Sequence, residues 1–97
     1  MAKYELAYTN IYLKELRLAR KRGFDEQKLN DVLLKLIEGQ PLPAKNRNHL
    51  LQGEYKGMWE CHITPDWLLI YEKSDVIRII TLQRTDTHAD LFGKNKR

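Results

Sequence analysis

Hydrophobic and polar residues recur with two different periods along this chain, and the first of them is helical. Apolar residues at three- and four-residue spacing predict a helix that begins after Thr9, a residue able to cap it, and ends near Arg22. A second stripe of the same period follows Asp25, another capping residue, and stops before Gly39. The first half of the chain is therefore predicted to form two helices in an antiparallel hairpin.

The second half of the chain has the period of strands. The segment Gln40–Gly53 has no periodicity and predicts a loop, whereas Tyr55–Ile63 alternates between apolar and polar residues. Trp67–Lys73 is almost continuously apolar, as in a strand covered on both faces, and Val76–Arg84 predicts a strand after a tight turn. A short alternating segment, Tyr4–Tyr8, predicts one more strand before the first helix.

The order strand, helix, helix, strand, strand, strand predicts an α+β domain. Its helical hairpin is expected to pack on one face of a small, mostly antiparallel sheet. A chain of 97 residues has room for one domain, which we place at residues 1–93. Residues 85–93 are expected to form a turn or a single helical turn, and the basic tail 94–97 is expected to be disordered.

Composition excludes several classes of protein. The single cysteine, Cys61, rules out an internal disulfide framework, and no CxxC or HExxH spacing indicates a metal. The longest apolar run, Trp67–Tyr71, is too short to span a membrane, and the first residues lack the apolar stretch of a secretion signal. We therefore expect a cytoplasmic protein with no membrane contact, no metal and no other cofactor.

Positive charge is concentrated in two places. The net charge is +4, and residues 14–22 carry five basic residues and one acid, while residues 94–97 carry three more basic residues. This distribution favours a polyanionic partner, nucleic acid first, although a solvated helix face would show the same pattern. The expected RNA or ribosome contacts are Lys14, Arg17, Lys21 and Lys56.

The predicted strand order gathers polar residues that could cleave RNA. Cleavage needs a base for the 2′-hydroxyl, an acid for the 5′-oxygen and a cation for the phosphate. The candidates are His49, Glu60, His62, Asp66, Arg84 and His88. The pattern also allows a plainer interpretation, in which Glu60 and His62 are ordinary solvent-facing residues and Arg84 pairs with Asp86 or Asp90.

Four sequence blocks resemble one known family of toxins. They are NHLLQG at 48–53, YKGMWECHI at 55–63, PDWLLIY at 65–71 and RTDTHADLFG at 84–93. In this order they resemble the YafQ branch of the RelE/ParE toxin superfamily. The resemblance implies the RelE/ParE-like fold and the toxin of a bacterial type II toxin–antitoxin pair. It further implies an endoribonuclease that cuts mRNA in the ribosomal A site without a metal and leaves a 2′,3′-cyclic phosphate.

The resemblance also assigns roles to residues by matching position. Asp66, helped by His62, is expected to act as base, His88 as acid and Arg84 on the scissile phosphate. The base and acid roles are interchangeable at this stage, because a sequence does not define how the RNA lies. His49 is expected to orient or stabilise the phosphate, with Glu60 and Phe92 in supporting positions. Asp86 departs from the family pattern, which commonly has a small residue there, and it could raise the pKa of His88 or pair with Arg84.

The same resemblance predicts partners and leaves two alternatives. Expected partners are a cognate antitoxin encoded nearby, the ribosome and its mRNA, with operator DNA reached only through the antitoxin complex. One alternative is a ParE-like poison of DNA gyrase that acts by binding alone and has no use for the His/Asp/Arg set. The other is a basic RNA- or ribosome-binding module without catalysis.

Overall fold

The computed structural model describes residues 2–87, in which two helices and a five-stranded sheet follow one another in the predicted order. Of the turn predicted at 85–93, residues 85–87 belong instead to β5, because they continue its pairing with β4. Residues 88–93, the tail 94–97 and the candidates His88 and Phe92 lie outside the described residues. The elements are β1 (Glu5–Tyr8), α1 (Asn10–Lys21), α2 (Glu26–Ile37), β2 (His49–Leu50), β3 (Trp59–Thr64), β4 (Trp67–Ser74) and β5 (Ile79–Thr87).

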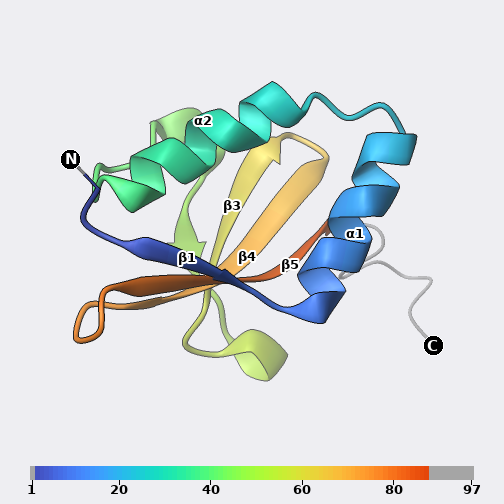
Figure 1. Ribbon diagram of the computed structural model, residues 1–97. Coiled ribbons are helices and arrows are strands. Elements are labelled where there is room, and N and C mark those ends of the chain that lie inside the picture. The colour runs from blue at the N-terminus through green and yellow to red at the C-terminus, as the bar shows by residue number, and fades with distance from the viewer. Residues whose placement is uncertain (1, 88–97) are drawn as a thin grey trace.

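The sheet is mixed, with strand order β1-β5-β4-β3-β2. β1 runs parallel to β5, and each of the other neighbouring pairs is antiparallel. Figure 1 shows α2 on one side of the sheet and the segment after β2 on the other, with α1 beside β5 at one end. The predicted α+β class, with the helices on one face of a mostly antiparallel sheet, is confirmed.

Both helices begin and end at residues whose side chains or backbones suit those positions. The Thr9 hydroxyl accepts a hydrogen bond from the Tyr12 amide at 3.0 Å, and the Asp25 carboxylate accepts one from the Gln27 amide at 3.1 Å. Past the end of α1, Gly23 has a φ of +80°, a left-handed conformation that glycine adopts without steric cost. The predicted helix boundaries are correct to within a residue.

The two faces of the sheet bury different side chains. The helix face carries the main core, where α1 and α2 pack on the alternate residues of β3, β4 and β5 that include Trp67, Leu69 and Leu82. The opposite face, which we call the loop face, buries Leu68 and Ile70 beneath the segment 51–58. β4 is thus covered on both sides, and this explains why its first five residues are all apolar. Within residues 2–87, neither helix is long and apolar enough to cross a bilayer.

Three details of the predicted strands are wrong. His49–Leu50 forms a short edge strand in a region predicted to be loop, because it pairs with Glu60 and Trp59 of β3. Tyr55 belongs to a 3₁₀ turn and packs on the loop face, and β3 begins at Trp59. The apolar pair Val76 and Ile77 lies in the exposed β4–β5 turn, 92% and 65% exposed, so β5 begins at Ile79.

An irregularity in β5 determines which face its last residues occupy. Ile70 of β4 pairs with Arg84, whereas the next residue, Tyr71, pairs with Leu82, so Gln83 is an extra residue opposite no partner. Strict alternation would place Leu82 and Arg84 on the same face. The bulge at Gln83 instead leaves Leu82 in the helix-face core and brings Arg84 to the loop face.

Candidate active site

Neighbouring strands bring three of the predicted site residues into one row on the loop face. His49 of β2 pairs with Glu60 of β3, Glu60 pairs with Ile70 of β4, and Ile70 pairs with Arg84 of β5. Neighbouring strands lie about 4.8 Å apart, so Glu60 and Arg84 are separated by about 10 Å across Ile70.

The imidazole of His49 contacts the carboxylate of Glu60. The Nδ1 atom of His49 lies 2.6 Å from the carbonyl oxygen of Arg47, which can only accept, so this nitrogen donates. Its Nε2 atom lies 3.1 Å from Oε1 of Glu60, whose side chain is only 6% exposed. The His49 imidazole and the buried Glu60 carboxylate therefore lie within ion-pair distance of each other.

The segment that carries His49 is attached to the sheet by two asparagines. The buried Asn46 donates its amide to the carbonyl oxygen of His62 at 2.7 Å. Asn48 accepts a hydrogen bond from the Tyr71 hydroxyl, also at 2.7 Å. These two contacts fix the chain on either side of Arg47, whose φ of 49° is left-handed. They therefore set the position from which His49 reaches Glu60.

His62 joins the same group from the neighbouring row of the loop face. Its Nε2 atom lies 3.9 Å from the Glu60 carboxylate, and its Nδ1 atom lies 3.4 Å from the carbonyl oxygen of Pro65. The side chain is 14% exposed, so it is partly accessible to a substrate. Asp66 follows Pro65 in the turn between β3 and β4 and is exposed. The structure thus brings His49, Glu60 and His62 together, whereas Asp66 lies at the end of the β3–β4 hairpin without a contact to them among the described interactions.

Arg84 is held by two residues that the sequence analysis did not single out. Its Nε atom donates to both oxygens of Glu15 at 3.0 Å, and its Nη2 atom donates to Oε2 of Glu15 at 2.5 Å. Its Nη1 atom donates to the Tyr55 hydroxyl at 2.9 Å. These hydrogen bonds, first those that Arg84 donates to Glu15, raise the pKa of Arg84 above its already high usual value, so the guanidinium is permanently charged.

The sequence contained one signal for Glu15 and none for Tyr55. Glu15 is the only acid among the basic residues of 14–22, and an isolated acid in such a run indicates a specific cationic partner. The alternation along Tyr55–Ile63 predicts Tyr55 on the face opposite Glu60 and His62. The 3₁₀ turn instead brings its hydroxyl to Arg84.

Asp86 pairs with Arg22 and not with Arg84; the other predicted effect, on the pKa of His88, concerns a residue outside the described part of the chain. Its carboxylate lies 3.3 Å from Nη1 of Arg22 and also accepts a hydrogen bond from the Thr87 amide at 2.8 Å. Arg84 pairs instead with Glu15, so the suggested Arg84–Asp86 pair is wrong. Arg22 follows the last turn of α1, and this contact joins that helix to the end of β5.

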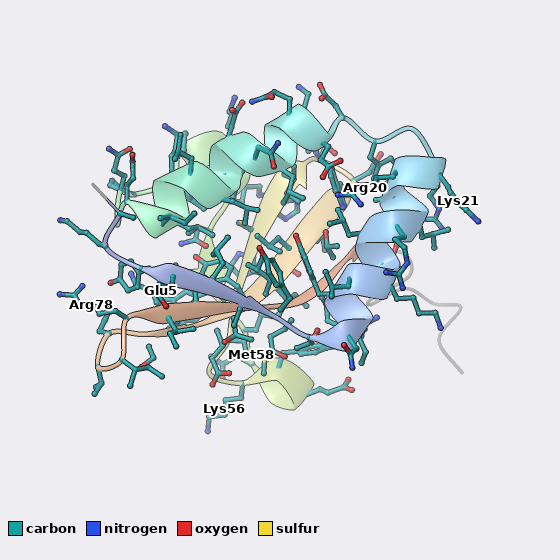
Figure 2. The ribbon with its side chains drawn as sticks, viewed as in Figure 1. Glu5, Arg20, Lys21, Lys56, Met58 and Arg78 are labelled. Atoms are coloured by element: carbon teal, nitrogen blue, oxygen red, sulfur yellow. The ribbon has the colours of Figure 1, made fainter. Side chains whose placement is uncertain are left out.

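Most of the predicted basic contacts lie along one groove. A hollow of about 650 Å³ runs beside α1 and is lined by Ile11, Lys14, Glu15, Arg17, Leu18, Lys21 and Arg84. The exposed bases of α1 and the guanidinium of the row therefore border the same space. Lys56 is separate from them, because Figure 2 shows it on the far side of the sheet from the helices, well away from Lys21.

No group of three His, Cys, Asp or Glu side chains within residues 2–87 is arranged to hold a metal ion. The lone cysteine does not offer a nucleophile either, because Cys61 is fully buried in the helix-face core and burial raises the pKa of its thiol to about 12. The chemistry available on the loop face is consequently that of imidazole, carboxylate and guanidinium groups.

Comparison of its sequence with family models places the chain among bacterial toxins of type II toxin–antitoxin systems. A sequence model described as "Bacterial toxin of type II toxin-antitoxin system, YafQ" matches residues 4–93. The chain belongs to this YafQ toxin family.

Characterised relatives match over nearly the whole chain. The mRNA interferase toxin YafQ of Escherichia coli strain K12 is 42% identical over 96% of this chain and 100% of its own length. The crystal structure of YafQ from E. coli strain BL21(DE3) is 38% identical, has a TM-score of 0.86 and covers 93% of this chain and 99% of that one. YafQ in the E. coli DinJ–YafQ toxin–antitoxin complex is 41% identical, with a TM-score of 0.85 and coverage of 94% and 99%.

Proposed function

We propose that this toxin is an endoribonuclease that cleaves mRNA held in the A site of the ribosome and so stops translation in the bacterial cytoplasm. Membership of the YafQ family and the relative named an mRNA interferase support the reaction class. The observation that carries the proposal is the row on the loop face, where the His49–Glu60 pair and the Arg84 guanidinium lie on either side of Ile70.

The proposed reaction is a transesterification within the RNA strand. A base removes the proton of a 2′-hydroxyl, whose oxygen then forms a bond to the adjacent phosphorus. The bond from phosphorus to the 5′-oxygen breaks, and an acid protonates that leaving oxygen. The products are a 2′,3′-cyclic phosphate and a 5′-hydroxyl, and no metal is needed because proton transfer and a cation supply the catalysis.

Each site residue has a role that suits its surroundings. Arg84 carries a permanent charge on the loop face and is assigned to the phosphate oxygens. His49, which contacts Glu60, is assigned to orient or stabilise the phosphate. Asp66, helped by His62, is assigned as base and His88 as acid, with Phe92 in support near the bases. These last assignments follow the positions of the family motif.

Cleavage on ribosomes tests the proposal directly. Purified toxin is added to translating ribosomes programmed with a short end-labelled mRNA, in buffer with and without a chelator that leaves the ribosome intact. We expect a cut in the A-site codon, equal rates in both buffers, and an upstream product whose 3′ end a ligase accepts only after the cyclic phosphate has been opened and removed. His88→Ala should reduce the rate at least about 10²-fold, the usual effect of removing a general acid or base.

Control measurements separate this proposal from the two alternatives. Lys28→Ala, on the exposed face of α2, should cleave like the unmodified toxin. Supercoiling by DNA gyrase should be unaffected at toxin concentrations that arrest translation, whereas inhibition would favour the ParE-like alternative. Ribosome binding without any cut in the mRNA would favour the non-catalytic module, and a wild-type rate for His88→Ala would remove His88 from the mechanism.

The proposed cytoplasmic partner is a cognate antitoxin whose acidic, flexible C-terminal segment folds on this surface. The relative in the DinJ–YafQ complex supports a protein partner, and two features here could receive it. They are the basic groove beside α1 and the outer edge of β1, the first strand of the sheet. Operator DNA would then be reached only through the antitoxin.

Calorimetry tests this mode of antitoxin binding. Folding of a segment on the toxin should give a strongly negative heat-capacity change, and pairing of acids with the basic groove should make the affinity fall steeply with salt. Titrations at two temperatures and two salt concentrations measure both. A small heat-capacity change with an affinity independent of salt would exclude this mode.

A further inference from the structure

Glu15 occupies the position beside β5 that a longer β1 would fill. β1 ends at Tyr8, which pairs with Leu82, and the chain then turns at Thr9 into α1. Beyond Leu82 the outer edge of β5 has no strand beside it among the described residues. The Thr85 amide on this edge donates to Oε1 of Glu15 at 2.9 Å, so a helix side chain replaces the missing strand. This contact fixes the carboxylate relative to the backbone next to Arg84.

The same carboxylate binds one particular edge of the Arg84 guanidinium. Nε and Nη2 both donate to Glu15, which engages the side edge of the planar group. Tyr55 accepts one N–H from Nη1. Five N–H groups are available on a guanidinium, so within residues 2–87 one on each η nitrogen has no protein partner. These two are available for an anionic oxygen of the substrate.

We propose that Glu15 is a positioning residue, which holds Arg84 in the orientation that presents its free N–H groups to the scissile phosphate. The inference rests on the role proposed above for Arg84. A free arginine side chain samples many rotamers, and ordering it at the moment of binding costs free energy. Glu15 and Tyr55 order the guanidinium in advance, which is the arrangement that transition-state stabilisation requires.

The competing interpretation is that Glu15 opposes catalysis by occupying Arg84. Both interpretations agree on the contact, and they differ in the sign of its effect on rate. If Glu15 positions Arg84, its loss slows the cleavage step. If Glu15 competes with the phosphate, its loss speeds that step. Glu15 also lies in a basic groove, so removing its charge should leave ribosome binding unchanged or slightly tighter.

The test measures single-turnover cleavage of ribosome-bound mRNA together with the affinity for ribosomes. Glu15→Gln keeps the size of the side chain but loses one acceptor oxygen, and we expect the saturating rate to fall about 10- to 100-fold without weaker binding. Glu15→Asp keeps a carboxylate and should recover most of that rate. A Glu15→Gln variant that cleaves as fast as the unmodified toxin, or faster, overturns the proposal.

A double-mutant comparison shows whether Glu15 acts through Arg84. Arg84→Ala alone should lose cleavage, and adding Glu15→Gln to it should cause less than about a twofold further loss. Independent, multiplying losses overturn the positioning role. If Arg84→Ala itself cleaves normally, the role proposed for Arg84 fails, and with it this inference. If Arg84→Ala is inactive and Glu15→Gln is normal, only the inference fails.

Two further variants control for stability. Glu26 forms a similar bidentate pair with Arg20, with distances of 2.9 and 2.7 Å, but away from the row. Glu26→Gln should therefore leave cleavage unchanged. If Glu15→Gln lowers the melting temperature too far to assay, Tyr55→Phe removes only the hydroxyl that Nη1 contacts. It should reduce the cleavage rate several-fold without weaker ribosome binding, and a normal rate would overturn the inference.

Discussion

Replacing Asn46 with alanine should release the segment that carries His49. Beyond Glu60, the outer edge of β3 has no strand beside it in the described part of the chain, because β2 pairs only with Glu60 and Trp59. The carbonyl oxygen of His62 lies on that edge, and the Asn46 amide, 2.7 Å away, supplies its partner. The side chain is buried, at 5% exposure, so water does not readily replace it.

The expected size of the effect follows from that single hydrogen bond. A buried carbonyl left without a partner costs about 1–3 kcal/mol, and the mean of that range is about 2 kcal/mol. For a domain of this size each kcal/mol lowers the melting temperature by about 4–8 °C, so Asn46→Ala should melt about 10 °C lower. The segment should also open locally more often, and trypsin should cut faster at Lys45 and Arg47.

Thermal unfolding followed by circular dichroism and a timed trypsin digest measure the two effects. Asn30→Ala is the matched control, because Asn30 lies on the exposed face of α2 and its loss should change stability by less than about 0.5 kcal/mol. If Asn46→Ala melts within about 3 °C of that control and resists trypsin equally, Asn46 does not anchor the segment. The role given to its hydrogen bond would then be wrong.

Three further predictions concern the surface, the core and a turn. The exposed bases of the α1 groove are Lys14, Arg17 and Lys21. Changing all three to Gln should weaken ribosome binding and make the affinity depend less on salt. An unchanged salt dependence would contradict the proposed contacts between these bases and RNA phosphates. Three bases on the α2 side are the control: Lys28, Lys35 and Lys45. Burial raises the pKa of Cys61 from 9.0 to about 12, so above pH 9 the unfolded chain loses a proton that the folded chain keeps. The free energy of unfolding should then fall by about 1.4 kcal/mol between pH 8 and 10 in urea titrations, and Cys61→Ala should remove that fall. Gly39→Ala should lower the free energy of unfolding by about 1–2 kcal/mol, and by more than Gly23→Ala does. Both glycines have a positive φ, but only at Gly39 would the new Cβ lie 3.1 Å from a neighbouring side chain, that of Lys3. Equal losses for the two variants would show that this close contact does not matter.

The helices could be predicted closely because their signals are local. Thr9, Asp25 and Gly23 act within a few residues of their own positions, and the apolar stripes need only a face to pack on. The start of β5 was predicted less well for the opposite reason. Val76 and Ile77 have strong strand preferences, but the turn that ends β4 leaves them exposed, and pairing with β1 begins only at Ile79.

The candidate site could be predicted in part. Glu60 and His62 share a face by simple alternation, and that expectation is confirmed for β3. The His49–Glu60 contact depends on a two-residue strand that no local pattern indicates, because it exists only through pairing with β3. Glu15 of α1 binds Arg84, which lies 69 positions later in the chain. Hydrophobic periodicity is a local pattern and does not predict a contact between residues so far apart.

The bulge at Gln83 determines which face of the sheet every later residue of β5 occupies. Adding or removing one residue between Leu82 and Arg84 would exchange the two faces for everything beyond it, sending Thr85 to the loop face and Arg84 into the core. A chain that lost Gln83 could keep every other residue and still lose from the loop face the cation that we propose binds the phosphate. Residues 75–78, by contrast, lie outside both β4 and β5. A change in the length of this turn would therefore not move any strand residue to the other face of the sheet. Length variation among related toxins should therefore collect at this turn and be absent around the bulge.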